Sequence, residues 1–179
     1  MSEACIQPMA AHDIERVAAI HGDCFEDSWS GDMIRRVLGT AGAFGLVARP
    51  DDAAPIAAFA LGRILADECE LLSLGVAPRE RRRGLGAALL DAAIARAAAM
   101  RVRRFFLEVG EFNGAARRLY ESRGLRIVGR REDYYALAAG GAMDALTMRC
   151  EPVLPARRHP ASPAAESAPD ASPAMSSRS

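Results

Sequence analysis

The chain has 179 residues, of which 50% are hydrophobic, so it is long and apolar enough to form one packed domain. Its 23 basic residues, all arginine, balance 23 acidic ones, and a formal net charge of zero gives no sign of a nucleic-acid partner. The scattered cysteines form no C-x-x-C pair, which argues against a metal site or a disulfide framework. The sequence has no signal pattern and no run of about 18 apolar residues, which favours a cytoplasmic protein without a membrane partner.

Two helices are predicted at the start of the chain. Apolar residues recur at helical spacing over residues 11–25, with acidic residues in the first turn, which is typical of an amphipathic helix. Ser30 can cap a second, short helix that runs to about Leu38, and Trp29 can pack onto Ile34 as a hydrophobic staple. The loop position would also allow Trp29 to contact a peptide substrate.

A segment rich in strands follows. Residues 43–49 and 56–65 have the composition of β-strands, and the Pro/Asp-rich turn between them predicts a hairpin. Residues 68–76 form a third predicted strand, residues 85–100 a helix with one buried face, and residues 104–109 a short strand. This order predicts a right-handed crossover between two parallel strands.

The last predicted elements close the domain. Asn113 can cap a helix that runs to about Arg123 and ends at Gly124 in a left-handed conformation. Strands are predicted near residues 125–136 and 143–150.

The composition changes after residue 151, where Pro, Ala and Ser dominate. Such a segment buries too little apolar surface to offset the entropy lost on ordering. We therefore expect one α/β domain over residues 1–151 and a disordered tail over residues 152–179.

The turn before the long helix has the sequence Arg81-Arg82-Arg83-Gly84-Leu85-Gly86. Backbone N–H groups in the first turn of a helix lack intrahelical partners, and the helix dipole favours negative charge there. Two glycines let a ligand approach the backbone, so the turn indicates a phosphate site, although a solvated Arg-rich connection has the same composition. The turn matches neither the P-loop nor the dinucleotide fingerprint, because no Lys-Ser/Thr follows the glycines and Leu89 stands where a third glycine would.

The pattern Arg81-x-x-Gly84-x-Gly86 resembles the pyrophosphate-binding signature of the GNAT family of N-acetyltransferases, which implies acetyl-coenzyme A (acetyl-CoA) as the ligand. If the strands at 68–76 and 104–109 diverge, their unpaired backbone groups could pair with the amide-bearing pantetheine arm as with an added strand. We expect N–H groups near Val76 to hold the thioester carbonyl, with Gly75 at a bulge or a close backbone approach. The residues expected to bind acetyl-CoA are Leu74, Val76, Arg81, Arg82, Arg83, Gly84, Leu85, Gly86, Ala87 and Asn113.

A second resemblance covers most of residues 11–149 and is to the RimI-like group of the GNAT family, enzymes similar to the ribosomal-protein alanine N-acetyltransferase. The matching runs are Trp29-Ser30, Leu107-Glu108-Val109, Asn113, Leu119-Tyr120-Glu121-Ser122-Arg123-Gly124-Leu125, Arg131-Glu132-Asp133-Tyr134-Tyr135 and Met143-Asp144-Ala145. The resemblance implies that Glu108 is the general base, directly or through water, and that Tyr120 is the acid that protonates the coenzyme A thiolate. The alternatives are a surface ion pair between Glu108 and an arginine, and simple core packing for Tyr120.

Three further residues are candidates for the acceptor side. Glu70 is on the central strand, where some relatives in the wider GNAT family place a base, so the resemblance implies that it could act as the base instead or bind the ammonium group of the acceptor. Tyr134 and Tyr135 resemble the tyrosine pair that lines the peptide entrance in N-terminal acetyltransferases, although strand alternation lets at most one of them face a groove. RimI-like sequences usually place a proline after this pair, whereas Ala136 follows here, a departure that bears on peptide selectivity more than on chemistry.

We therefore expect the GNAT fold, a mixed twisted β-sheet with splayed central parallel strands flanked by helices. The resemblance implies an enzyme that transfers the acetyl group of acetyl-CoA to a primary amine, preferably a protein N-terminus and in particular the N-terminal alanine of a ribosomal protein, without a metal. The alternatives are an acetyltransferase for a small-molecule amine or an internal lysine, and a non-catalytic module that senses acetyl-CoA.

Overall fold

The computed structural model describes residues 4–136 and 142–153, with the backbone alone described at 133–136 and 142. Its strands are β1 (Cys5–Pro8), β2 (Ala43–Arg49), β3 (Ala58–Leu65), β4 (Glu68–Val76), β5 (Arg104–Gly110), β6 (Arg126–Ala136) and β7 (Ala142–Cys150). Its helices are α1 (Ile14–Cys24), α2 (Gly31–Leu38), α3 (Leu85–Ala99) and α4 (Gly114–Glu121), with short 3-10 turns η1 (Ala11–Asp13) and η2 (Pro78–Glu80).

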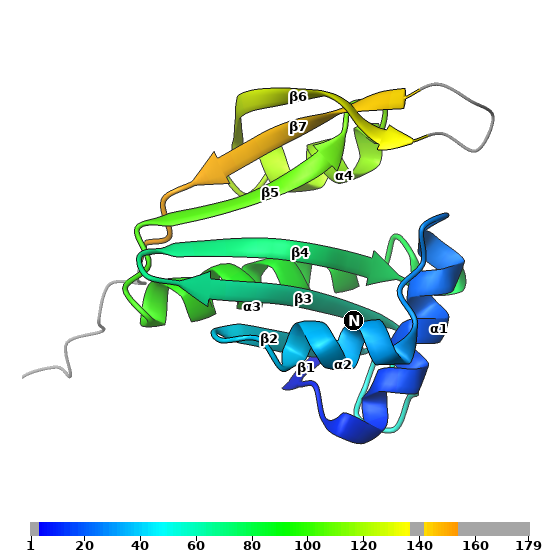
Figure 1. Ribbon diagram of the computed structural model, residues 1–179. Helices are drawn as coiled ribbons and strands as arrows, with labels where there is room; N and C mark the ends of the chain where they lie inside the picture. The colour runs from blue at the N-terminus through cyan, green and yellow to red at the C-terminus, as the bar shows by residue number, and fades with distance from the viewer. Residues whose placement is uncertain (1–3, 137–141, 154–179) are drawn as a thin grey trace, which may run out of the picture.

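The strands form one sheet in the order β1-β2-β3-β4-β5-β7-β6, in which β4 and β5 are parallel and the other described neighbours are antiparallel. Helices cover both faces (Figure 1). One core lies between the sheet and the helices α3 and α4, and it includes Leu89, Leu90, Phe105, Leu107 and Met148. A second core lies on the other face, under α1 and α2, and it includes Val17, Ile20, Ile34, Phe59 and Leu61.

The predicted caps are confirmed. The Ser30 hydroxyl accepts a hydrogen bond from the Met33 N–H at the start of α2 (3.3 Å), and the Asn113 side chain accepts one from the Ala116 N–H at the start of α4 (3.1 Å). Gly124, just past α4, has φ +82°, as the left-handed helix end requires.

The differences from the predicted elements lie at the N-terminus and in β3. Strand β1 was not expected, because a four-residue segment carries too little periodicity, and its pairing with Leu46–Arg49 of β2 makes it a strand. The strand predicted at 56–65 begins at Ala58 instead. The predicted tail at 152–179 lies outside the described residues, apart from 152 and 153.

The central parallel strands are splayed, as predicted. Strand β4 pairs with β5 only from Glu68 to Leu71, opposite Arg104 to Leu107. Beyond these residues β4 continues to Val76 beside β3, and β5 continues to Gly110 beside β7. The two strands therefore diverge toward their carboxyl ends, on the right of Figure 1.

The bulge in β4 lies at Leu72, so a bulge at Gly75 was wrong. The register with β3 shifts because Leu61 opposes Ser73 while Gly62 opposes Leu71, which leaves Leu72 as the extra residue. Gly75 keeps its regular pairing with Phe59. The absence of a side chain at Gly75 lets the Phe59 ring pack against the backbone, because a Cβ there would lie 2.6 Å from a carbon of that ring. The extra residue also reverses the alternation, so that Leu74 packs on the α3 side together with Leu71.

Candidate active site

The turn before α3 presents a row of unpaired backbone donors. Gly84 is the N-cap of α3 with φ +84°, and Arg82 also has a positive φ of 65°. Ala88 is the first residue of this helix whose N–H is bonded, to the Gly84 carbonyl at 3.0 Å. Within the described residues, no backbone N–H from 82 to 87 donates to another group. These amides lie at the positive end of a 15-residue helix, which is the arrangement that binds phosphate.

The three arginines of this turn have different surroundings. The Arg81 guanidinium donates through Nε to the Val76 carbonyl at 3.2 Å. Arg83 pairs with Glu80, three residues before it. Arg82 is exposed and has no hydrogen bond or ion pair within the described residues, which makes it the arginine most available to a phosphate.

The second glycine of the turn brings three elements together. A Cβ on Gly86 would lie 3.4 Å from Val76 Cγ2 and 3.5 Å from Leu119 Cδ2. The start of α3 is therefore in close contact with the end of β4 and with α4, which positions the unpaired amides beside the splay.

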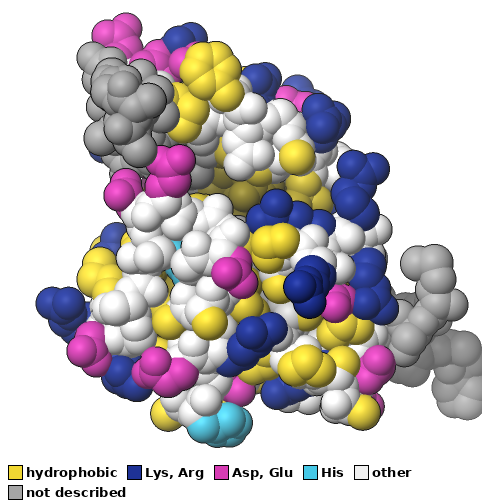
Figure 2. Space-filling view, turned by 90° about the vertical axis from the view of Figure 1, so that its right-hand side faces the viewer, with side chains coloured by type: hydrophobic (Ala, Val, Ile, Leu, Met, Phe, Trp, Pro, Cys, Tyr) yellow, Lys and Arg dark blue, Asp and Glu magenta, His cyan; other side chains and the backbone are white. Residues whose placement is uncertain are grey.

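The edge of β4 that faces the splay also has unpaired groups. The Ala77 N–H donates to the Ala57 carbonyl at 2.8 Å, next to the pair formed by Val76 and Ala58. Because bonding directions alternate along antiparallel strands, the N–H and C=O groups of Leu74 and Val76 point away from β3. No strand of the described chain pairs with this edge beyond Leu71. Figure 2 shows the surface at this end of the sheet, where a hollow floored by hydrophobic side chains has arginines along one side.

Glu108 lies at the first position of β5 beyond its pairing with β4. Its neighbours Leu107 and Val109 point into the core under α3 and α4, so alternation directs Glu108 to the opposite face. The side chain is 18% exposed and accepts a hydrogen bond from Arg131 Nη1 at 2.8 Å. The ion pair considered as an alternative for Glu108 is therefore present, at the border of the splay.

Glu70 lies on the same face but within the paired part of the two strands. It is opposite Phe106, two residues or about 7 Å before Glu108 along β5. Its carboxylate accepts a hydrogen bond from Arg63 Nη2 at 3.2 Å and lines a separate pocket of about 200 Å³. Glu108 is thus the carboxylate nearer to the diverging ends.

Tyr120 lies on the other side of the sheet, in the core shared by α3, α4 and β5, with 8% of its surface exposed. A group held in the splay would therefore have Glu108 on one side and Tyr120 on the other. Asn113 uses its side-chain oxygen as the cap of α4, which leaves its NH₂ group to bind a ligand.

The acceptor-side candidates are less fully described. Trp29 packs into the core that contains Ile34, as the staple requires, and its indole stacks on the buried His21 ring with centroids 5.2 Å apart. Tyr134 and Tyr135 belong to β6, but their side chains and the loop at 137–141 lie outside the described part of the structure.

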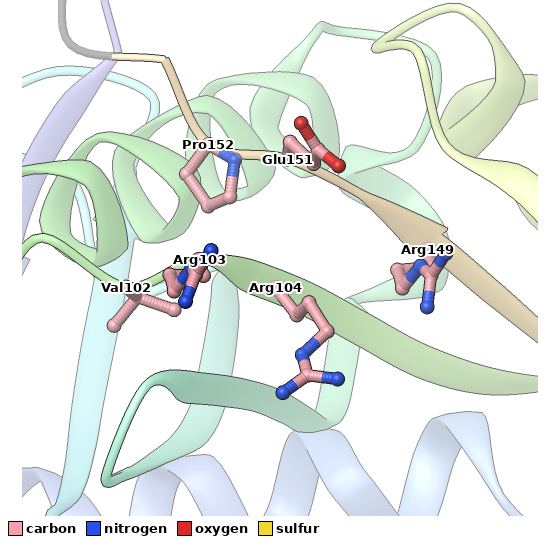
Figure 3. Close-up of a pocket in the computed structure, with 6 residues that line it drawn as sticks. All are labelled: Val102, Arg103, Arg104, Arg149, Glu151 and Pro152. Carbon is pink, nitrogen blue, oxygen red and sulfur yellow. The ribbon is translucent and has the colours of Figure 1, made fainter.

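A pocket of about 620 Å³ lies at the opposite end of β5. Figure 3 shows its lining, in which Arg103 and Arg104 at the start of β5 lie across from Arg149 and Glu151 at the end of β7. It is a polar surface hollow far along the sheet from the unpaired amides of the turn, so the pocket does not belong to the candidate site.

Two contacts near the site have partners that the sequence did not identify. Arg131 is the arginine that bonds to Glu108, and Cys24 Sγ donates to the Val76 carbonyl (3.3 Å). Each joins residues far apart in the chain, and no local pattern identifies such pairs. In the described part of the chain, no group of three or more His, Cys, Asp and Glu residues could hold a metal ion, and no helix is long and apolar enough to cross a membrane.

Comparison with known proteins agrees with this architecture. The Acetyltransferase (GNAT) family profile matches residues 14–125. The [Ribosomal protein bS18]-alanine N-acetyltransferase of Escherichia coli K12 is 39% identical over 93 residues, which span 52% of this chain and 62% of that relative. The Haemophilus ducreyi protein of the same name is 29% identical over 143 residues, covering 80% of this chain and 97% of that one. The crystal structure of the ribosomal-protein-S18-alanine N-acetyltransferase from Escherichia coli superposes with a TM-score of 0.77 at 27% identity, over 88% of this chain and 99% of that one.

The chain spans less than two thirds of the E. coli relative in the sequence match, whereas the structural match extends over nearly all of it. The family profile, the splayed parallel strands and the glycine turn at the start of α3 all agree. The chain belongs to the GNAT family of acetyltransferases.

Proposed function

We propose that this protein transfers the acetyl group of acetyl-CoA to the N-terminal α-amine of a protein, and that its acceptor is the N-terminal alanine of ribosomal protein bS18. The acceptor is suggested by the relatives, whose names specify an alanine of ribosomal protein bS18. The observation that supports acetyl-CoA as the donor is that two sets of unpaired backbone N–H groups lie close together, one at residues 82–87 and one at the free edge of β4.

The diphosphate of the donor would be held by the N–H groups at the start of α3, with added charge from Arg82, which has no partner within the described residues. The pantetheine amides would pair with the free edge of β4 at Leu74 and Val76. Arg83, Leu85, Gly86 and Ala87 are the other residues of this turn that we propose to lie along the donor, and Asn113 would donate from its side-chain NH₂ group.

The reaction needs one proton removed and one supplied. The amine nitrogen attacks the thioester carbonyl carbon, and the Val76 N–H would stabilise the oxygen as it becomes negative. Glu108 would take the proton from the amine, directly or through water, and Tyr120 would give a proton to the coenzyme A thiolate as the carbon–sulfur bond breaks. Arg131 holds Glu108 in the free protein, so it must share or release the carboxylate when the amine arrives.

The acceptor would approach from the face that carries Glu108. Trp29, Glu70, Tyr134 and Tyr135 are the residues that we propose to line its path. The proposal assigns the activity to residues 1–151 and no part of it to the tail at 152–179, and a ribosomal acceptor implies a cytoplasmic enzyme. The ion pair between Glu108 and Arg131 also suits a module that binds acetyl-CoA without turnover, which is the second candidate.

The test is incubation of the full chain with labelled acetyl-CoA and a panel of acceptors. The panel contains peptides that begin with Ala, Ser or Met, of which the Ala peptide has the N-terminal sequence of bS18. It also contains a blocked peptide whose only amine is a lysine, and polyamines. Label on free N-termini alone, strongest on the bS18 peptide, is the expected result. Label on the lysine peptide or on a polyamine would show that the acceptor is that amine and not a protein N-terminus. Binding of acetyl-CoA with no label on any acceptor would identify a sensor.

A further inference from the structure

The carbonyl oxygen of Val76 is held by two side chains. Arg81 Nε donates to it at 3.2 Å from the glycine turn, and Cys24 Sγ donates to it at 3.3 Å from the end of α1. Arg81 Nη2 also lies 3.7 Å from Cys24 Sγ, so the two donors contact each other as well as the same oxygen. The end of β4 is thereby tied to α1 and to the turn.

The peptide group that follows Val76 is fixed on both sides. Its oxygen accepts the two bonds just described, and its nitrogen, that of Ala77, donates to the Ala57 carbonyl of β3 at 2.8 Å. The Val76 carbonyl points toward the side from which β5 has diverged, where it would otherwise be available to a strand or to water. The Arg81 and Cys24 bonds occupy this carbonyl and leave the Val76 N–H as the open donor.

We infer that Arg81 is a positioning residue, assisted by Cys24, that holds Val76 so that its N–H faces the thioester carbonyl. This inference rests on the proposed function. It changes the role expected for Arg81 from the sequence, where the residue was a phosphate ligand. Its guanidinium is engaged with Val76, whereas Arg82 in the same turn has no partner within the described residues.

The geometry provides a variant that separates the two roles. Glutamine carries its side-chain nitrogen at the same place along the chain as arginine Nε, so Arg81→Gln keeps a donor for the Val76 oxygen and removes the charge. Arg81→Leu removes both. Arg82→Gln is the matched control, because it removes a charge from the same turn without touching Val76.

Steady-state kinetics of the full chain then distinguish positioning from phosphate binding. Arg81→Leu should lower kcat about tenfold or more, as expected for a displaced reacting group, with little change in KM for acetyl-CoA. Arg81→Gln should recover most of kcat, and Arg82→Gln should raise KM and leave kcat largely intact. If Arg81→Gln and Arg81→Leu instead raise KM alike, in a salt-dependent way and without loss of kcat, Arg81 is a phosphate ligand and the inference is overturned.

A second measurement does not depend on turnover. In the free protein, Arg81→Leu and Cys24→Ala should each speed hydrogen exchange at the Ala77 amide, whereas Arg82→Gln and Cys24→Ser should not. In the double variant Arg81→Leu/Cys24→Ala, the exchange rate of the Ala77 amide should rise by more than the two single effects combined. The reason is that each donor partly compensates for the loss of the other at the Val76 oxygen. If the Ala77 amide exchanges at the same rate in all variants, the inference is overturned, even if acetyl transfer is observed. If the wild-type chain transfers no acetyl group, the proposed function alone is refuted.

Discussion

Replacement of Gly84 by alanine tests the turn that begins α3. Gly84 has φ +84° and ψ −5°, and a Cβ built there meets nothing within 4 Å. The substitution therefore causes no clash, and its cost is the local strain of a left-handed alanine, about 1–2 kcal/mol. The expected loss thus has a single physical source.

That strain must be observed in one of two places. If the variant keeps the left-handed turn, its free energy of unfolding falls by about 1–2 kcal/mol. If the turn relaxes in the free protein, acetyl-CoA has to restore it, and the Kd rises by a factor of about 5–30. We expect the two losses together to sum to about 1–2 kcal/mol.

The assay combines denaturant unfolding with calorimetric titration of acetyl-CoA. Gly86→Ala is the matched control, because Gly86 has no positive φ and a Cβ there makes ordinary contacts of 3.4 Å or more. Alanine favours the helix, so this control should be as stable as the wild type or up to about 1 kcal/mol more stable. A Gly84→Ala variant that matches the wild type in both measurements would refute the reasoning, as would a Gly86→Ala variant that loses as much stability.

Three further predictions concern single residues. Tyr120→Phe should lower kcat by about 10²–10⁴ with little change in acetyl-CoA affinity, and an unchanged kcat would remove Tyr120 from the acid role. Glu108→Gln should lower kcat over the same range of about 10²–10⁴ while Glu70→Gln stays near the wild type, and the reverse order would assign the base to Glu70. Burial lowers the pKa of His21 below its ordinary value of 6.5. As the pH falls, His21 therefore takes up a proton in the unfolded chain before it does so in the folded protein. The stability that neutral His21 contributes is complete above pH 6.5 and is lost as the pH falls below 6.5. Thermal unfolding between pH 8 and 5 should therefore show a steeper acid-side loss of Tm in the wild type than in His21→Phe, and equal slopes would contradict this.

The fold was largely predictable because its signals are local. Strand β4 ends before Pro78, α3 begins after Gly84, and Ser30 and Asn113 are caps, and each of these depends on a few adjacent residues. The parallel pairing of β4 with β5 was also foreseen, since a crossover between them follows from the order of the elements. Their splay was expected from the resemblance to the GNAT family.

The features that the sequence did not reveal depend on distant partners. The bulge at Leu72 is set by the register with β3, and the bonds of Glu108 to Arg131 and of Val76 to Cys24 join residues that only the folded chain brings together. Strand β1 is likewise defined by its pairing with β2. The roles of Tyr134 and Tyr135 remain predictions.

The most direct test of the central claim is an NMR titration of the ¹⁵N-labelled protein with acetyl-CoA. The account predicts that the amide resonances of residues 84–87 and Val76 shift and saturate together, because their N–H groups receive the diphosphate and the thioester. Resonances of Arg103, Arg104 and Arg149, at the polar hollow on the far end of β5, should stay in place. Shifts confined to those arginines, or none at residues 84–87, would contradict the account.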